Sequence, residues 1–195
     1  MPSLTIPVAA QNDDGYWGKI GGGSCHRAGT EVLCGLEDVA FSFGSSNTAW
    51  PCLRFVMPLD KRSRILSCRL HYRASATVGA GDILTRIGLE DVDDAVDLAA
   101  NCLTHTRVMT TSYVAWTGAL PTTINLWYYS PSFHGSLTEV LNRPGWVPGQ
   151  HVAVMGHVIG GPVSRLEFYS FDVGAPSIPE LVIKYANKNA GVSIF

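Results

Sequence analysis

The sequence predicts an all-β protein, a jelly-roll-type antiparallel β-sandwich with one amphipathic helix near residues 130–143. Short apolar or alternating runs recur between turn residues along most of the chain, which is the pattern of many short strands. The 20 glycines and 11 prolines supply these turns. No regular alternation of strand and helix patterns indicates a parallel sheet, and 195 residues suit one sandwich domain. We therefore expect a single domain over residues 1–186, followed by a tail at residues 187–195.

The expected strands are short runs bounded by turn signals. They lie at residues 3–10, 32–35, 39–43, 52–57, 64–75, 82–89, 103–107, 112–116, 125–129, 152–159, 165–171 and 181–185. The region of about residues 11–50, with its NDDG and GGGS segments, is expected to be mostly loops, because glycine, asparagine and aspartate favour turns.

The clearest strand pattern lies at residues 64–75, where apolar and polar side chains alternate. A period of two turns one face of a strand to the core and the other to water. The expected core face carries Leu66, Cys68, Leu70, Tyr72 and Ala74, and the expected water face carries Ser67, Arg69, His71, Arg73 and Ser75. Cys68 is therefore expected to be a buried apolar residue rather than a reactive thiol, and His71 a surface residue among solvated charges.

One amphipathic helix is expected within residues 130–143. Its large apolar side chains fall on one face of a 3.6-residue period, at Phe133, Leu137, Val140 and Leu141. We expect Ser130 or Ser132 to cap its first turn, with Pro131 at an early position where a missing N–H does no harm. Pro144 and Gly145 should end it.

Charge and motifs disfavour several classes of function. The 14 basic and 16 acidic residues give a net charge of −2 with no basic block, so nucleic acid is not an expected partner. No run of 18 apolar residues is present to span a membrane. The histidines lack HExxH spacing, and neither GxSxG nor a P-loop lysine occurs, so we expect no enzyme.

The start of the chain and the cysteines indicate a reducing compartment of synthesis. The first residues, MPSLTIPVAAQNDDGYW, lack the charged segment and long apolar run of a secretion signal, so we expect synthesis in the host cytoplasm without a signal peptide. The five cysteines are odd in number and form no CxxC pair, so no disulfide framework is expected. A Cys25–Cys34 bridge is the alternative.

An acidic run at residues 90–97, EDVDDAVD, is the one candidate metal site. Ca²⁺ binds six to eight oxygen atoms, and carboxylates from another loop could complete the set. The candidate ligands are Asp13, Asp14, Glu90 and Asp91. The run lacks the glycine and terminal glutamate of an EF-hand, so the alternative is a solvated loop whose carboxylates cap neighbouring elements. Apart from this ion no cofactor is expected.

Aromatic residues in or beside loops are the candidate carbohydrate-binding residues. Trp50, Trp127 and Tyr129 offer ring faces on which the C–H faces of a sugar could stack. The alternative is that Trp127 and Trp146 hold the two ends of the helix onto the sheet.

The tail at residues 187–195, NKNAGVSIF, is polar first and then apolar at Val192, Ile194 and Phe195. Three exposed apolar groups at a chain end leave favourable burial unused, so we expect the tail to be covered. It could add an edge strand to its own sheet, or act as an assembly arm that adds a strand to a neighbouring subunit.

Several segments between residues 50 and 186 resemble one known type of module. They are LRFVMP at residues 53–58, ILSCRLHY at 65–72, SYVAW at 112–116, SPSFHGSLTEVLNRPGWVPG at 130–149 and APSIPELVIKY at 175–185, of which RPGW is the most specific. This pattern resembles the jelly-roll, carbohydrate-binding-like modules of the DNRLRE type found in bacterial surface and phage structural proteins. The glycine-rich segment at residues 15–24 departs from it, and such modules usually form part of long secreted chains.

The resemblance implies a function by assembly and recognition. A module that stands alone without a leader is expected in a phage particle, since lysis replaces secretion. The expected protein is a non-enzymatic virion component of the capsid decoration or tail, bound to other virion proteins and to copies of itself. The alternatives are a carbohydrate-binding module and, third, a small glycan-acting enzyme on the same fold.

Overall fold

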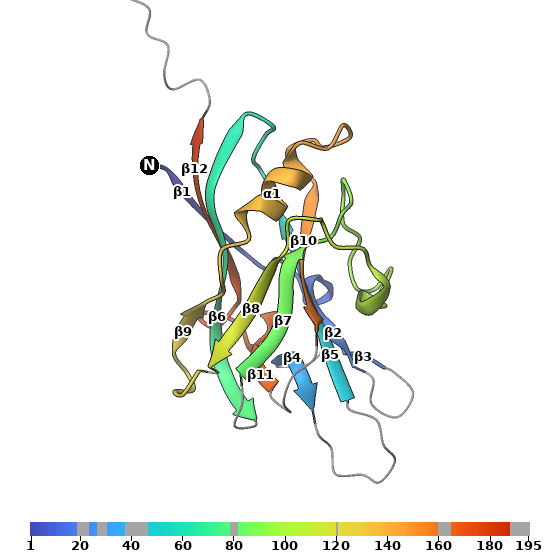
Figure 1. Ribbon diagram of the computed structural model, residues 1–195, viewed down its shortest axis with the longest axis vertical. Helices are drawn as coiled ribbons and strands as arrows, with labels where there is room; N and C mark the ends of the chain where they lie inside the picture. The colour runs from blue at the N-terminus through green and yellow to red at the C-terminus, as the bar shows by residue number, and fades with distance from the viewer. Residues whose placement is uncertain are drawn as a thin grey trace, which may run out of the picture.

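The computed structural model describes residues 1–18, 24–26, 31–37, 47–78, 82–119, 121–159 and 165–187. Within them the chain forms two antiparallel sheets packed as a β-sandwich with one short helix, α1 (His134–Leu141), so the predicted fold class is confirmed (Figure 1). The strands are β1 (Ser3–Pro7), β2 (Asp14–Gly18), β3 (Ser24–His26), β4 (Glu31–Glu37), β5 (Asn47–Val56), β6 (Ser63–Val78), β7 (Asp82–Leu89), β8 (Val114–Ala119), β9 (Trp127–Tyr129), β10 (His151–Val158), β11 (Arg165–Tyr169) and β12 (Glu180–Asn187).

The strand order is β1-β12-β6-β11-β4-β5-β10-β7-β8, and every pairing is antiparallel. The long strand β6 joins the two sheets, because its first half pairs with β12 and its last residues pair with β11. The short strand β9 also pairs with β6, and β2 pairs with both β3 and β5. In Figure 1, β1, β12, β6 and β9 form one side of the sandwich, and α1 lies across its upper end.

The N-terminal quarter contains more strand than its composition predicted. Residues 11–50 were expected to be mostly loops, but β2, β3, β4 and the start of β5 lie there. Glycine weakens a strand only by roughly 1 kcal/mol, which pairing on both edges can offset, as for β2 between β3 and β5. Conversely, the expected strand at residues 103–107 is wrong, because Thr104–Thr106 form a 3₁₀ turn. The expected strand at residues 39–43 lies outside the described residues.

The alternation predicted for β6 is confirmed over most of its length. Cys68, Leu70, Tyr72 and Ala74 are at most 3% exposed and belong to the core. Near its start the pairing with β12 shifts register, so that Ile65 becomes buried in place of Leu66. Burial also raises the pKa of the Cys68 thiol, which fits the predicted unreactive residue.

The apolar face predicted for the helix is also confirmed. Phe133, Leu137, Val140 and Leu141 are at most 2% exposed and pack into the main core between the sheets. The predicted capping is wrong, because the helix begins at His134 and its N-cap residue is Phe133, which makes no side-chain capping hydrogen bond. Ser130 Oγ instead accepts the backbone N–H of Leu70 at 3.0 Å, and Ser132 Oγ accepts that of Cys68 at 3.2 Å. These serines thus attach the segment to β6, and the helix begins only where that attachment ends.

The RPGW segment after the helix is a structural turn. Arg143 forms ion pairs with Asp91 and with Asp93, the latter at 2.8 Å. A Cβ atom at Gly145 would overlap the Asp93 carboxylate, so a larger residue there would displace the carboxylate that pairs with Arg143. Trp146 is 3% exposed, and its indole N–H donates to the Leu59 carbonyl at 3.0 Å. The most specific part of the resemblance therefore holds the sandwich together, and Trp146 is a core residue.

Among the described residues, no helix has the length and apolar character needed to cross a membrane.

Candidate functional site

The outer face of the β6–β9–β12 side carries a stack of three rings. Trp127 and Tyr129 are two residues apart on β9, so both side chains point to the same side of the sheet. The His71 ring on β6 lies between them, with ring centroids 4.4 Å from Trp127 and 4.3 Å from Tyr129. Both pairs are close to parallel, at 27° and 15°. Two of the predicted carbohydrate-binding residues thus belong to one site, and Tyr129 remains 53% exposed.

The stack includes a residue that sequence reasoning assigned to the open surface. The His71 side chain is only 19% exposed, and its Nδ1 lies 3.0 Å from Glu180 Oε2 on β12. His71 thus lies on the outer face of β6 that the alternation predicted, but it is partly buried and paired with Glu180 rather than surrounded by solvated charges. The two alternating aromatics at Trp127 and Tyr129 were a usable signal, but only the β6–β9 pairing places them beside His71.

A groove of about 460 Å³ lies beside this stack. Its lining residues come from three neighbouring strands and are Ser67, Arg69, Tyr129, Val182 and Lys184. The antiparallel register sets Arg69 opposite Val182 and Ser67 opposite Lys184, so β6 and β12 form the floor. Tyr129 from β9 is the aromatic side of the groove.

Trp50 does not belong to this site. It lies on β5 opposite Trp17 of β2, with ring centroids 5.1 Å apart. His105 packs against both rings, 3.8 Å from Trp17 and 5.6 Å from Trp50. The three aromatic residues predicted to bind sugar thus lie in two places, because Trp50 is on β5 whereas Trp127 and Tyr129 are on β9.

The four predicted calcium ligands are not assembled into a site. Among the described residues, no group of three or more His, Cys, Asp or Glu side chains could hold a metal ion. Each of the four carboxylates has another partner: Asp13 pairs with Arg54, Asp14 accepts the Phe171 N–H, Glu90 pairs with Arg107 and Asp91 pairs with Arg143. Carboxylates of the acidic run thus bind positively charged side chains that hold the loop, whereas the calcium site stays a prediction.

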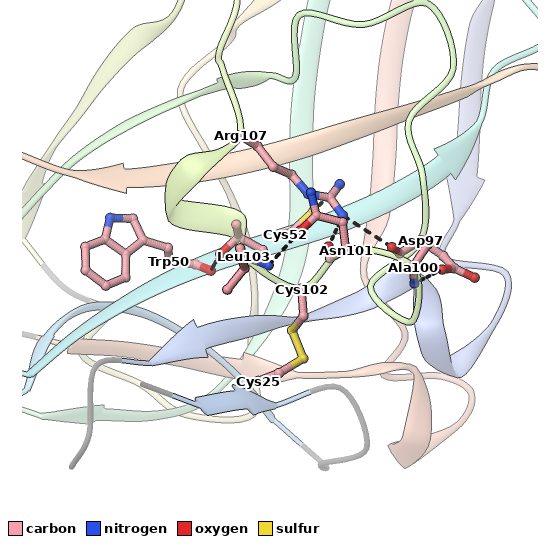
Figure 2. The surroundings of a disulfide bond; sticks show 10 residues. Cys25, Trp50, Cys52, Asp97, Ala100, Asn101, Cys102, Leu103 and Arg107 are labelled. Carbon is pink, nitrogen blue, oxygen red and sulfur yellow. Dashed lines mark hydrogen bonds between the residues drawn. A yellow bond between two sulfur atoms is a disulfide. The ribbon is translucent and has the colours of Figure 1, made fainter. Parts of the chain in front are cut away.

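Arg107 organises the loop at residues 90–110 (Figure 2). Its side chain is 1% exposed and pairs with Glu90 at 3.0 Å. The guanidinium also donates to backbone carbonyls of the loop, at Val96, Asp97 and Asn101. A buried arginine requires such partners, since an unpaired buried charge is strongly unfavourable. These bonds hold the loop over the outer side of β5.

A disulfide joins this loop to β3, contrary to the sequence prediction. Cys25 is bonded to Cys102, with Cα atoms 5.8 Å apart (Figure 2). The expected absence of a disulfide is wrong, and so is the Cys25–Cys34 alternative. An odd cysteine count excludes only complete pairing, and the two partners are 77 residues apart, so no spacing rule reveals them. Cys52 and Cys68 are free and buried.

Asp14 makes the stability of the fold depend on pH. The residue is 1% exposed, and burial raises its pKa to about 7, against the opposing effect of the Phe171 N–H. The neighbouring Asp172 and Asp13 raise it further. In the unfolded chain the Asp14 carboxyl ionises near its usual pKa of 3.8, whereas in the folded chain it stays protonated up to about pH 7. Its contribution to stability is therefore complete at low pH and is lost as pH rises from about 4 to about 7.

We predict that Asp14→Asn loses less stability over that interval than the parent protein. Urea unfolding at several pH values measures the free energy of unfolding of both proteins, and their difference isolates this carboxyl from the other titrating groups. Asp172→Asn removes a neighbouring charge that raises the Asp14 pKa, so its loss of stability over this interval should lie between those of the parent and of Asp14→Asn. If the free energy of unfolding depends on pH in the same way for Asp14→Asn and for the parent, the prediction is contradicted.

Compared with known proteins, the chain matches no protein-family model, and no curated protein is similar enough to count as a relative.

Proposed function

We propose that the chain is a non-enzymatic virion protein of a phage, a capsid decoration or tail component, that acts by assembly and surface recognition. The observation that carries this proposal is the outer face of β6, β9 and β12, where a ring stack and a groove are built on a rigid sheet. A sheet holds such side chains at fixed spacing, which suits recognition of a ligand. The resemblance of residues 50–186 to modules of phage structural and bacterial surface proteins supports the virion setting.

The sheet edges and the tail support the assembly part of the proposal. Strands β1 and β8 end the strand order, so each has an outer edge without a partner strand among the described residues. Such an edge can accept a strand from another chain. The tail residues Val192, Ile194 and Phe195 lie outside the described residues, and their role as an assembly arm for a neighbouring subunit remains our proposal.

The disulfide supports a protein that works outside the reducing cytoplasm. Disulfides persist in oxidising surroundings and are rare in cytosolic proteins. A particle made in the host cytoplasm and released by lysis would meet such surroundings, where Cys25 and Cys102 could join. The bond therefore fits a virion protein that works outside the cell.

Deletion of residues 188–195 should leave a folded protein that no longer forms oligomers or attaches to particles. The deletion begins after β12, so the described sandwich stays complete. Native mass spectrometry and cosedimentation with purified particles measure the two losses, and circular dichroism confirms folding. A variant with Val192, Ile194 and Phe195 changed to serine keeps the chain length and should behave like the deletion. Unchanged oligomers and attachment would contradict the assembly arm.

The second candidate function is a carbohydrate-binding module, either free or part of a virion. The specific observation in its favour is the Trp127–His71–Tyr129 stack, since exposed aromatic rings are the surfaces on which sugar rings pack. Glu180 holds His71 in place from β12, so the stack is positioned before any ligand binds. In this candidate the affinity comes from Tyr129 and Trp127, whereas Trp50 contributes nothing because it lies elsewhere in the fold.

A further inference from the structure

The groove beside Tyr129 has a positively charged floor. Arg69 and Lys184 are both exposed, and both line the groove. Within the described ranges neither side chain forms an ion pair with a carboxylate. By contrast, Arg73, on the same face of β6, is already bound to the Asn125 carbonyl and the Ser177 hydroxyl. Arg69 and Lys184 are therefore cations of this groove that remain available to a ligand.

The Glu180 carboxylate beside the ring stack already has a partner. Glu180 is bonded to His71, and the groove itself is lined by no Asp or Glu side chain. A ligand in the groove would thus meet two cations, the Ser67 hydroxyl and the exposed ring of Tyr129. The complement of this surface is a molecule with a negative charge, hydroxyl groups and a flat C–H face.

We infer that this groove binds an acidic oligosaccharide that contains hexuronic acid residues. One sugar ring packs on Tyr129, and carboxylates of the chain pair with Arg69 and Lys184. The groove volume of about 460 Å³ falls in the range of roughly 300–1,000 Å³ that ligand pockets have. This inference rests on the carbohydrate-binding candidate and adds the chemical class of its ligand.

Charge complementarity favours an acidic glycan over the two nearest alternatives. A neutral sugar would use Tyr129 and leave both cations unpaired. A single-stranded nucleic acid would need a positive path that follows several phosphates, together with rings that stack on successive bases. The groove offers two free cations beside one largely exposed ring, and the whole chain has a net charge of −2.

The test compares sugars that differ only in charge. The probes are tetragalacturonate and tetraglucuronate, each with its fully methyl-esterified form, and a ten-residue oligothymidylate. Titration calorimetry of the full chain should show binding of at least one acid form, with the matching ester bound about tenfold or more weakly, because two charge-assisted contacts are lost. Added salt should weaken binding of the acid and leave binding of the ester nearly unchanged.

Variants identify the groove as the binding site. Arg69→Gln with Lys184→Gln should reduce affinity for the acid to that for the ester, while leaving the ester unaffected. The double variant Arg62→Gln with Arg64→Gln is the matched control, since it removes the same amount of charge. Both arginines are exposed and lie outside the groove. Tyr129→Ala should weaken binding of both the acid and the ester, whereas Trp50→Ala should weaken binding of neither.

Each outcome separates this inference from the functions on which it rests. Equal binding of acid and ester would overturn the acidic ligand and retain a carbohydrate-binding module. Absence of binding by all four sugars at millimolar concentration would overturn the acidic ligand, while attachment to particles would still test the virion proposal. Tighter binding of oligothymidylate than of either acid would overturn the inference in favour of nucleic acid.

Discussion

Loss of the Cys25–Cys102 disulfide is expected to lower the free energy of unfolding by about 4 kcal/mol, because the bond closes a loop with a sequence separation of 77 residues. In the chain-entropy account, a cross-link over so long a loop restricts the unfolded chain and thereby raises its free energy. The bond also attaches β3 to the loop that Arg107 organises, so its removal frees two segments in the folded state.

Urea unfolding of the parent with and without reductant measures this effect. The double variant Cys25→Ser with Cys102→Ser should match the reduced parent and should not respond to reductant. That variant also serves as the control for any other effect of the reductant, since Cys52 and Cys68 are already free thiols. Equal stability of the oxidised parent and the double variant would show that the bond does not stabilise the fold.

The second large effect is expected for Leu137→Asp, which should reduce stability by more than the roughly 2–5 kcal/mol typical of Leu→Ala in a core. Leu137 is 0% exposed, and α1 contacts both β6 and β7. An aspartate there loses the apolar contacts and in addition leaves a buried charge without a partner.

Thr138→Asp is the matched control, because it introduces the same charge one residue along the helix, at an exposed position. Its effect should stay within about 1 kcal/mol, as is usual for surface substitutions. Thermal and urea unfolding followed by circular dichroism compare the two variants with the parent. If Leu137→Asp unfolds with the same midpoint as Thr138→Asp, α1 is not part of the core.

Predictions that depend on local periodicity were accurate. The alternation in β6 and the 3.6-residue spacing in α1 each identified the buried face, as the burial of Leu70 and Leu137 confirms. Side-chain direction follows from the repeat of the backbone itself, so neighbouring residues are sufficient to predict it. For the same reason the end of the helix before Pro144 and Gly145 was predicted correctly, since these residues act within their own turn and Leu141 is the last helical residue.

Predictions that depended on composition were less accurate. The glycine-rich start was expected to be loops, yet β2 is paired on both edges. The acidic run was expected to collect a cation, yet Asp91 and Asp93 bind Arg143 from a turn about fifty residues away in sequence. Composition indicates only the local structure or ligand that a residue type favours, whereas the partners of these residues come from distant segments of the chain.

The sequence by itself therefore determined the class of fold and the faces of its longest strand and its helix. Only the tertiary structure decided which distant residues meet: Cys25 with Cys102, Arg107 with Glu90, and His71 with Trp127, Tyr129 and Glu180. The candidate site lies entirely in this second group, because strand pairing brings β6, β9 and β12 together. Pairing of distant strands depends on packing of the whole sandwich, and no short stretch of sequence contains that information.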